Sequence, residues 1–575
     1  MKNVKPMIIV LSVVIIAACG KSYLDKRPLG DLDESALANK KGVERLLIGA
    51  YSLLDGIGGP KSGWFSAASN WIYGSVCGSE AYKSGQGSDD QQPIAPLELF
   101  TVTANNEAIA SKWATVYDGV QRANDVLRVM KKATDIPLED QKRIAAEARF
   151  LRAHYHFEAK KMWNDIPYVD ETVTYGSGNE FISNTLDAWP AIEKDLIYAI
   201  ENLNDVSYAG AVGRANKYTA LALLAKAYMF QKKYAEAKPL LVSIIQSGKY
   251  KLVNYADNFN PASRNSDESI FSAQMSVTEG DGGMNGNYGD VLNFTNNGGP
   301  GTCCGFFSPS QFLVNHFKTN SFTGLPDLDH FNDSDVWNDD GKKSSDPFNQ
   351  YEETLDPRLD WTVGRRGIPY LDWGLHPGDD WIRNQLYGGP YSPKKNVYSK
   401  EQQGKLSGTT GWGADGITAN NVNLIRYADI LLWAAEVEIE IGSLEKAREY
   451  VNLIRERASK TDGWVKNPNG KFAPYAANYK VGLYQADDWT NKEFARKALR
   501  YERMLELGME GHRFFDLVRW GIAAEEIMVY AEKEKNKRSY LTGLDFTKGC
   551  NEYFPIPQRE IDLSGGKMVQ TRPCY

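Results

Sequence analysis

The sequence has few of the residues and motifs on which common enzyme active sites are built. Only six of its 575 residues are histidine, and no HExxH, GxSxG, phosphate-loop or dinucleotide-binding motif occurs. His154 and His156 stand two apart in a helical pattern, so they point to different faces and cannot chelate one ion. We therefore predict no catalytic centre, no metal site and no cofactor.

An excess of positive charge is also missing. The formal net charge is −7 and the isoelectric point is about 5.7. This argues against a nucleic-acid-binding protein, which needs a basic face to displace counterions. Hydrophobic residues make up 42% and charged residues 24%, a globular balance that argues against both intrinsic disorder and a polytopic membrane protein.

Cysteine is sparse, and one of the six cysteines belongs to a leader-like segment. Lys2 and Lys5 precede an apolar stretch that ends in Ala17-Ala18-Cys19. The stretch is too short for a permanent membrane span, and it resembles a bacterial lipobox. Residues 1–18 are thus predicted to be a lipoprotein signal peptide and Cys19 the acylated first residue of the mature chain, 19–575. The alternative is an ordinary secretory signal with an incidental cysteine.

The remaining five cysteines are an odd number, so they do not form a complete disulfide framework. No CxxC pair occurs, and the adjacent Cys303 and Cys304 lack the spacing of a zinc site. We interpret these cysteines mainly as buried thiols. A Cys550–Cys574 bridge in an oxidising compartment stays open.

Helical periodicity dominates both ends of the chain. It predicts helices over 108–132, 144–162, from Asn184 as N-cap to about 203, 217–231, 234–246, 425–441, 444–458 and 500–509, the last strong one. The two predicted helical hairpins, 217–246 and 425–458, have similar sequences, with small residues where the two helices of each hairpin cross. Tetratricopeptide units share this pattern, and they stack because a single hairpin cannot bury its apolar face alone. Between them, about 255–421 is rich in Gly, Asn, Asp and aromatic residues. We predict a mainly α fold: a tetratricopeptide-like scaffold (about 35–254 and 422–575) carrying an irregular, loop-rich ligand-binding subdomain.

A series of short motifs gives the chain a specific likeness. Asp356-Pro357-Arg358-Leu359 is one, and the others lie at 145–153, 155–157, 165–167, 425–436, 503–521 and 555–557. In this order they resemble the SusD/RagB family of outer-membrane nutrient-binding lipoproteins over nearly the whole chain. The resemblance implies a non-catalytic protein, anchored by lipid in the outer membrane and facing the cell exterior. It would bind a nutrient, which we expect to be an oligosaccharide or polysaccharide, and deliver it to a SusC-like TonB-dependent transporter.

Charged residues near the C-terminus could be read as acid/base chemistry. They stand at helical spacing or just beyond it: Arg503, Glu506, Glu510, Arg513, Asp516 and Arg519. Because each acid has an arginine within about a turn, we interpret them as a structural charge network. The same applies to Glu147 with Arg149 and Arg152, and to Arg426 with Asp429. The acidic stretch 327–335 could supply calcium ligands but lacks the full loop spacing, so we expect a solvated loop.

Aromatic residues are abundant, at 12% with 31 Tyr and 14 Trp. Trp113, Tyr228 and Trp433 follow helical spacing and are expected in the core. Rings in loop sequence can instead stack on sugars while nearby polar groups bond hydroxyls. The predicted ligand-binding residues are Trp64, Trp71, Tyr73, Tyr82, Tyr288, Trp373, Trp381, Arg383, Tyr387 and Trp412.

Two other functions remain open at this stage. A glycoside hydrolase on a helical scaffold would need two carboxyl groups about 5–9 Å apart in a cleft. A tetratricopeptide adaptor would bind only protein.

Overall fold

A computed structural model describes residues 34–58, 63–174, 176, 178–277, 285–301, 303–409 and 416–575. The predicted signal peptide, Cys19 and Trp412 lie outside these residues. No helix in the described part of the chain is long and apolar enough to cross a membrane.

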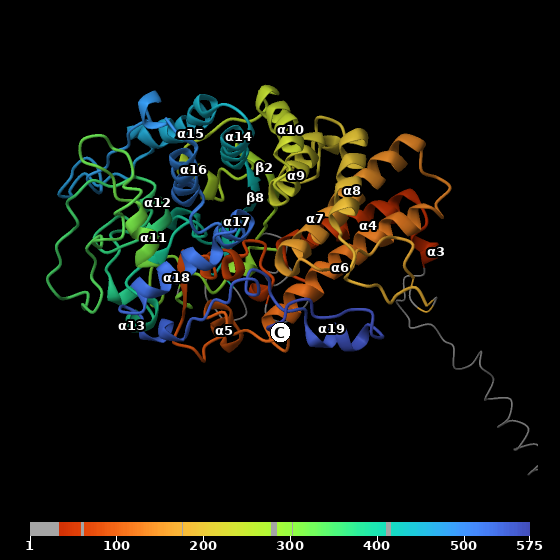
Figure 1. The fold of residues 1–575 in the computed structure, drawn as a ribbon, viewed down its shortest axis with the longest axis horizontal. Coiled ribbons are helices and arrows are strands. Elements are labelled where there is room, and N and C mark those ends of the chain that lie inside the picture. The colour runs from red at the N-terminus through yellow and green to blue at the C-terminus, as the bar shows by residue number, and fades with distance from the viewer. Residues whose placement is uncertain are drawn as a thin grey trace, which may run out of the picture.

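The N-terminal half is a stack of antiparallel helices at one end of the molecule (Figure 1). Its helices are α3 (Glu34–Leu37), α4 (Lys40–Ser52), α5 (Ala95–Glu98), α6 (Glu107–Met130), α7 (Leu138–Trp163), α8 (Trp189–Asn202), α9 (Lys217–Phe230) and α10 (Tyr234–Gln246). Each long helix packs on the next from α6 to α10, and α10 packs on α14 although about 180 residues separate them in sequence. Asn106 and Asn216 start α6 and α9 by accepting hydrogen bonds from backbone N–H groups of the first turn.

The C-terminal helices continue this stack. They are α14 (Tyr427–Ile441), α15 (Leu444–Ser459), α16 (Lys492–Leu507), α17 (Arg513–Trp520), α18 (Ala523–Glu534) and α19 (Gln558–Leu563). α14 packs on both α15 and α16. The fold class is therefore confirmed as a mainly α scaffold of tetratricopeptide-like hairpins.

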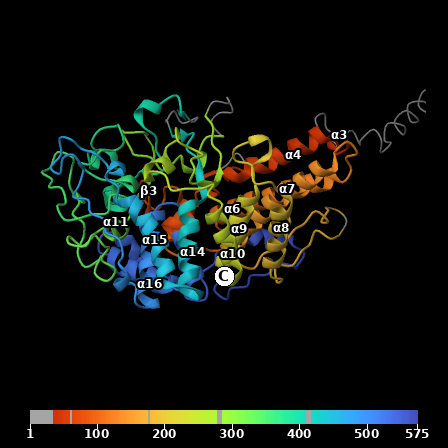
Figure 2. The ribbon, with the colours of Figure 1, turned by 90° about the horizontal axis from the view of Figure 1, so that it is seen from above.

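Between α10 and α14 the chain forms only short elements among the residues described there. Its helices are α11 (Gln311–His316), α12 (Leu359–Thr362) and α13 (Gln385–Gly388), and in both overall views α11 lies at the end opposite α3, α4 and α8 (Figures 1 and 2). Together with β1 from the N-terminal half, the strands among the described residues form four two-stranded sheets: β1 (Ala81–Ser84) with β3 (Phe306–Pro309), β2 (Ser269–Ala273) with β8 (Val422–Arg426), β4 (Val363–Gly364) with β5 (Ser392–Pro393), and β6 (Ser407–Gly408) with β7 (Ile417–Thr418). The antiparallel β2–β8 pair joins the two ends of this irregular region, since Ser269 lies opposite Arg426.

Most predicted helices are confirmed, with differences at the ends. α7 begins at Leu138, directly after Pro137, and α16 begins at Lys492 rather than 500. Ile425 was expected in a helix, but it pairs with Phe271 in the β2–β8 sheet. The expectation that 500–509 is the last strong helix is wrong, because α17 and α18 follow.

Asn184 does not cap α8, which begins at Trp189 with no side-chain cap. Its buried side chain instead donates to the carbonyl oxygens of Asp165 and Val569. Asn184 thus holds the C-terminal segment against the scaffold, a long-range role that local sequence does not reveal.

The structure pairs four of the cysteines that were interpreted as buried thiols. Cys303 bonds to Cys304, and Cys550 bonds to Cys574. The open alternative for Cys550 and Cys574 is therefore confirmed, and the thiol interpretation holds only for buried Cys77. The second bridge ties exposed Cys574 to Cys550, which is buried.

The acidic motifs near the C-terminus form a buried charge network, as predicted. Glu506 is fully buried and contacts three guanidinium groups, those of Arg358 at 3.0 Å, Arg426 at 2.5 Å and Arg457 at 2.5 Å. Burial raises the pKa of Glu506, but these arginines outweigh it and hold the pKa well below its usual range. The connected network continues through Asp356, Glu268, Glu502, Glu510, Arg455 and Lys395.

Two expected pairings within the motifs are wrong. Glu147 pairs with Arg143 and Arg214 rather than with Arg149 or Arg152. The Arg426 side chain reaches the glutamates of the network, while the Asp429 carboxylate accepts from the Arg426 backbone N–H and pairs with Arg503 at 3.7 Å. Arg143 shares α7 with Glu147, but Arg214 and the glutamates that pair with Arg426 come from segments distant in sequence.

Candidate functional site

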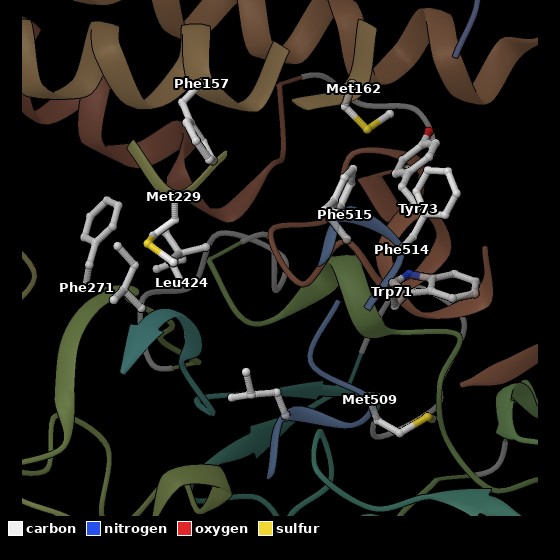
Figure 3. Close-up of a cluster of buried hydrophobic side chains, with 14 of the residues drawn as sticks. Trp71, Tyr73, Phe157, Met162, Met229, Phe271, Leu424, Met509, Phe514 and Phe515 are labelled. Carbon is white, nitrogen blue, oxygen red and sulfur yellow. The ribbon is translucent and has the colours of Figure 1, made fainter. Parts of the chain in front are cut away.

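Four of the predicted ligand-binding aromatics, Trp64, Trp71, Tyr73 and Tyr82, lie in the core instead. Trp71, Tyr73 and Tyr82 are each only 1% exposed, and Figure 3 shows Trp71 and Tyr73 among buried side chains that include Phe514 and Phe515. Their polar atoms are satisfied internally: Trp71 Nε1 donates to the Gly289 carbonyl, and the Tyr73 hydroxyl bonds backbone oxygens. The prediction of exposed rings is wrong here, because an irregular segment that passes through the core shows no period to reveal its burial.

Trp64 and Tyr288 are brought together from segments more than 200 residues apart. Their ring centroids lie 6.1 Å apart, and Trp64 Nε1 donates to Gln91 Oε1 at 2.9 Å. Gly63 supports the contact, since a Cβ there would lie 3.0 Å from the Tyr288 ring. Trp64 is buried and Tyr288 half-buried, so Tyr288 is the ring of this pair that can meet a ligand.

Trp381 packs against the glycine-rich segment. A Cβ on Gly298 would lie 2.4 Å from Trp381 Nε1, and Gly299 has a φ of +74° with its own close approach to the ring. A side chain at position 298 would clash with the indole, and one at 299 would be strained by the left-handed backbone, so glycine suits both positions. Tyr370 and His376 meet the same indole edge-on, with centroids 5.8 and 5.3 Å away. Trp381 is thus rigidly held, yet half-buried.

Trp373 is held in a similar way. Its Nε1 donates to the Tyr398 carbonyl at 2.8 Å, and its ring meets Tyr398 at 6.0 Å. Because the N–H is used by the protein, the half-buried indole has mainly its ring surface to offer a ligand.

Polar groups lie in the same loops. Arg383 donates to the Cys304 carbonyl at 2.9 Å and pairs with Asp90 at 3.1 Å, and both side chains are about a quarter exposed. Tyr387, also predicted to bind, stacks on Tyr540 with centroids 4.2 Å apart. We call the loop site the set Tyr288, Trp373, Trp381, Asp90 and Arg383. It offers ring surfaces and hydrogen-bonding groups, the chemistry that binds sugars.

The sequence analysis missed two tryptophans that flank a cavity of about 480 Å³. Trp361 from α12 and Trp464 after α15 both line it. Trp464 follows Asp462-Gly463 in loop sequence, and that signal, the one used for Trp373, would have found it. Trp361 stands in a short helix whose four residues show no period.

No metal site is evident in the described part of the chain. No group of three or more His, Cys, Asp or Glu side chains there is placed to hold an ion. In the acidic stretch 327–335, Asp329 is two-thirds exposed and pairs with Lys497.

Comparisons with known proteins place the chain. Residues 267–575 match the model of the SusD family, and residues 23–229 match a model described as "Starch-binding associating with outer membrane". The chain belongs to the SusD family. Among curated members, it is 24% identical to SusD-like protein P25 of Formosa agariphila over 553 residues, covering 90% of each chain.

Solved structures of the family share the fold. A laminarin-binding SusD-like protein has a TM-score of 0.65 at 22% identity, covering 93% of this chain and all of that one. Surface glycan-binding protein A from Bacteroides thetaiotaomicron in complex with laminarihexaose has a TM-score of 0.62 at 20% identity, covering 92% and 99%. At these identities the likeness establishes the helical scaffold.

Proposed function

We propose that this SusD-family member is a non-catalytic surface glycan-binding protein. It binds an oligosaccharide or polysaccharide at the loop site and delivers it to a partner TonB-dependent transporter of the outer membrane. The observation that carries the proposal is the set of half-buried rings, Tyr288, Trp373 and Trp381, on loops held rigidly by a family scaffold. Solved structures with this scaffold include a laminarin-binding SusD-like protein and surface glycan-binding protein A in complex with laminarihexaose, which supports a glycan as the ligand.

The arrangement of the acidic residues supports binding without turnover. The carboxylates that the motifs bring together are buried and paired with arginine, as Glu506 and Asp516 are. A glycosidase instead needs an acid and a base or nucleophile facing the scissile bond. We expect the glycan to be recovered intact after incubation with the protein.

The proposal includes a lipid anchor. Residues 1–18 would direct export, and acylated Cys19 would hold the domain, 19–575, at the outer membrane facing the exterior, because several acyl chains bind firmly at about 0.8 kcal/mol per methylene. Cys19→Ala should move the protein from the membrane to the soluble fraction. Wild-type incorporation of labelled palmitate into that variant would refute the anchor.

A binding screen tests the central claim. The purified protein is titrated calorimetrically with neutral hexaoses of differing linkage, laminarihexaose and maltohexaose among them. We expect micromolar to millimolar affinity for at least one, about −4 to −8 kcal/mol, since a collector that releases its cargo gains little from slower dissociation. Trp373→Ala should weaken that affinity. Absence of binding to every glycan would refute the proposal.

A further inference from the structure

The cavity between Trp361 and Trp464 lies apart from the loop site but shares a wall with it. Leu371 and Val397 line the cavity, and they also belong to the small cluster against which Trp373 and Trp381 pack. Much of the remaining wall comes from 256–261, 399–402 and 462–466, and Pro369, Asp372 and Lys394 also line the cavity. Its volume, about 480 Å³, is within the range of about 300–1,000 Å³ typical of small-molecule sites.

Both indoles at the cavity are fixed by the main chain. Trp361 Nε1 donates to the Gly463 carbonyl at 2.8 Å, and Trp464 Nε1 donates to the Ala458 carbonyl at 2.9 Å. Both rings are half-buried. Two aromatic surfaces are therefore held in place without further ordering, which lowers the entropic cost of binding a flat ligand.

Two carboxylates of the cavity lack a partner. Neither Asp257 nor Asp462 has a side-chain hydrogen bond or ion pair within the described ranges. Burial without a compensating cation raises the pKa of Asp257. The half-buried Asp257 carboxylate is costly unless something donates to it, whereas Asp462 is exposed; hydroxyl groups can donate to both.

The other charged groups of the cavity are already engaged or exposed. Lys394 donates to the carbonyls of Asp360 and Pro369, and the Asp372 carboxylate accepts the backbone N–H groups of Lys400 and Glu401. Lys466 is exposed. No buried cation in the described part of this cavity is left to bind an acidic sugar.

We propose that this cavity is a second carbohydrate pocket, in which a short neutral oligosaccharide stacks on Trp361 and Trp464 and donates hydroxyl hydrogen bonds to Asp257 and Asp462. The proposal rests on the proposed glycan-binding function but concerns different residues. A glycan held at the loop site could place a second segment, or a second chain, in this pocket.

Hydrogen–deuterium exchange with the purified full-length protein separates the two sites. The probe is whichever neutral hexaose binds in the calorimetric screen. We expect it to protect backbone amides in 256–262 and 461–466, which report on the pocket, as well as in 288–301 and 373–383, which report on the loop site. Asp257→Ala with Asp462→Ala should weaken pocket protection at least tenfold in hexaose concentration and leave loop-site protection unchanged. Trp373→Ala should do the reverse.

The controls keep the outcome decisive. A charge-matched pair, Asp333→Ala with Asp487→Ala, removes two exposed acids far from both sites in sequence and should change neither. Because the Asp257 and Asp462 carboxylates have no partner among the described residues, their replacement should leave the unfolding midpoint unchanged. The exposed Asp462→Ala change alone serves if the double variant unfolds. Protection confined to the loop site, or a double variant with wild-type pocket protection, would overturn this proposal while leaving the proposed function intact. No hexaose binding anywhere would overturn both.

Discussion

The buried charge network around Glu506 permits a test that separates structural from catalytic carboxylates. The network contains five acids, Glu506 with Asp356, Glu268, Glu502 and Glu510, and five cations, Arg358, Arg426, Arg455, Arg457 and Lys395. These charges balance. Glu506→Gln removes one negative charge with little change in shape and leaves a net positive charge away from water.

The expected loss is large, because breaking a buried pair from one side typically costs about 3–5 kcal/mol of unfolding free energy. Denaturant titration followed by circular dichroism measures it. Glu449→Gln is the matched control: Glu449 pairs with Lys446, and both are about half exposed, so the change should be below about 1 kcal/mol. Glycan affinity of the folded Glu506→Gln protein should match the wild type.

Two results would refute this reasoning. Stability within about 1 kcal/mol of the wild type would mean that the network does not need its charge balance. Hydrolysis of a glycan by the wild-type protein, abolished in a fully stable Glu506→Gln variant, would make Glu506 a catalytic residue and the protein an enzyme.

Three further predictions follow from burial and pairing. Trp373→Ala should cost about 1–3 kcal/mol of glycan binding with little loss of stability. Trp433→Ala removes a ring that is only 2% exposed, so it should cost about 3–5 kcal/mol of stability without altering the affinity measured on the folded protein. The opposite pattern would mean that Trp433 binds the glycan and Trp373 supports the fold. Burial raises the pKa of Asp516, but its two arginine partners outweigh burial and lower the pKa to about 2. The carboxylate therefore stabilises the fold above about pH 4, and this contribution is lost as the pH falls through 2. In denaturant titrations, the free energy of unfolding should fall less between pH 5 and pH 2.5 in Asp516→Asn than in the wild type; an equal fall in both would contradict the shift. Cys574→Ser removes the bridge to Cys550, 24 residues away, and should lower the free energy of unfolding by about 2–4 kcal/mol in a denaturant titration. When both proteins are fully reduced, the variant and the wild type should be equally stable.

Local patterns in the sequence were enough to predict most of the scaffold. Helical period and turn residues located α6, α9, α10 and α15 within a residue or two, because amphipathic spacing and capping act within a few residues of each other. The order of short motifs likewise identified the SusD family. Several of these motifs contain buried salt-bridge partners, such as Arg358 and Glu506, which tie distant segments of the chain together.

Which rings meet solvent was decided by tertiary structure alone. Trp71 and Trp373 both stand in aperiodic sequence, yet Trp71 is covered by chain more than 200 residues away, with Phe306 and Phe307 against its ring, while Trp373 stays half-buried. Ile425 joins a strand because Phe271 arrives beside it. The cavity between Trp361 and Trp464 exists because segments a hundred residues apart converge there. Burial depends on which distant segment packs against a side chain, and local periodicity carries no information about that partner.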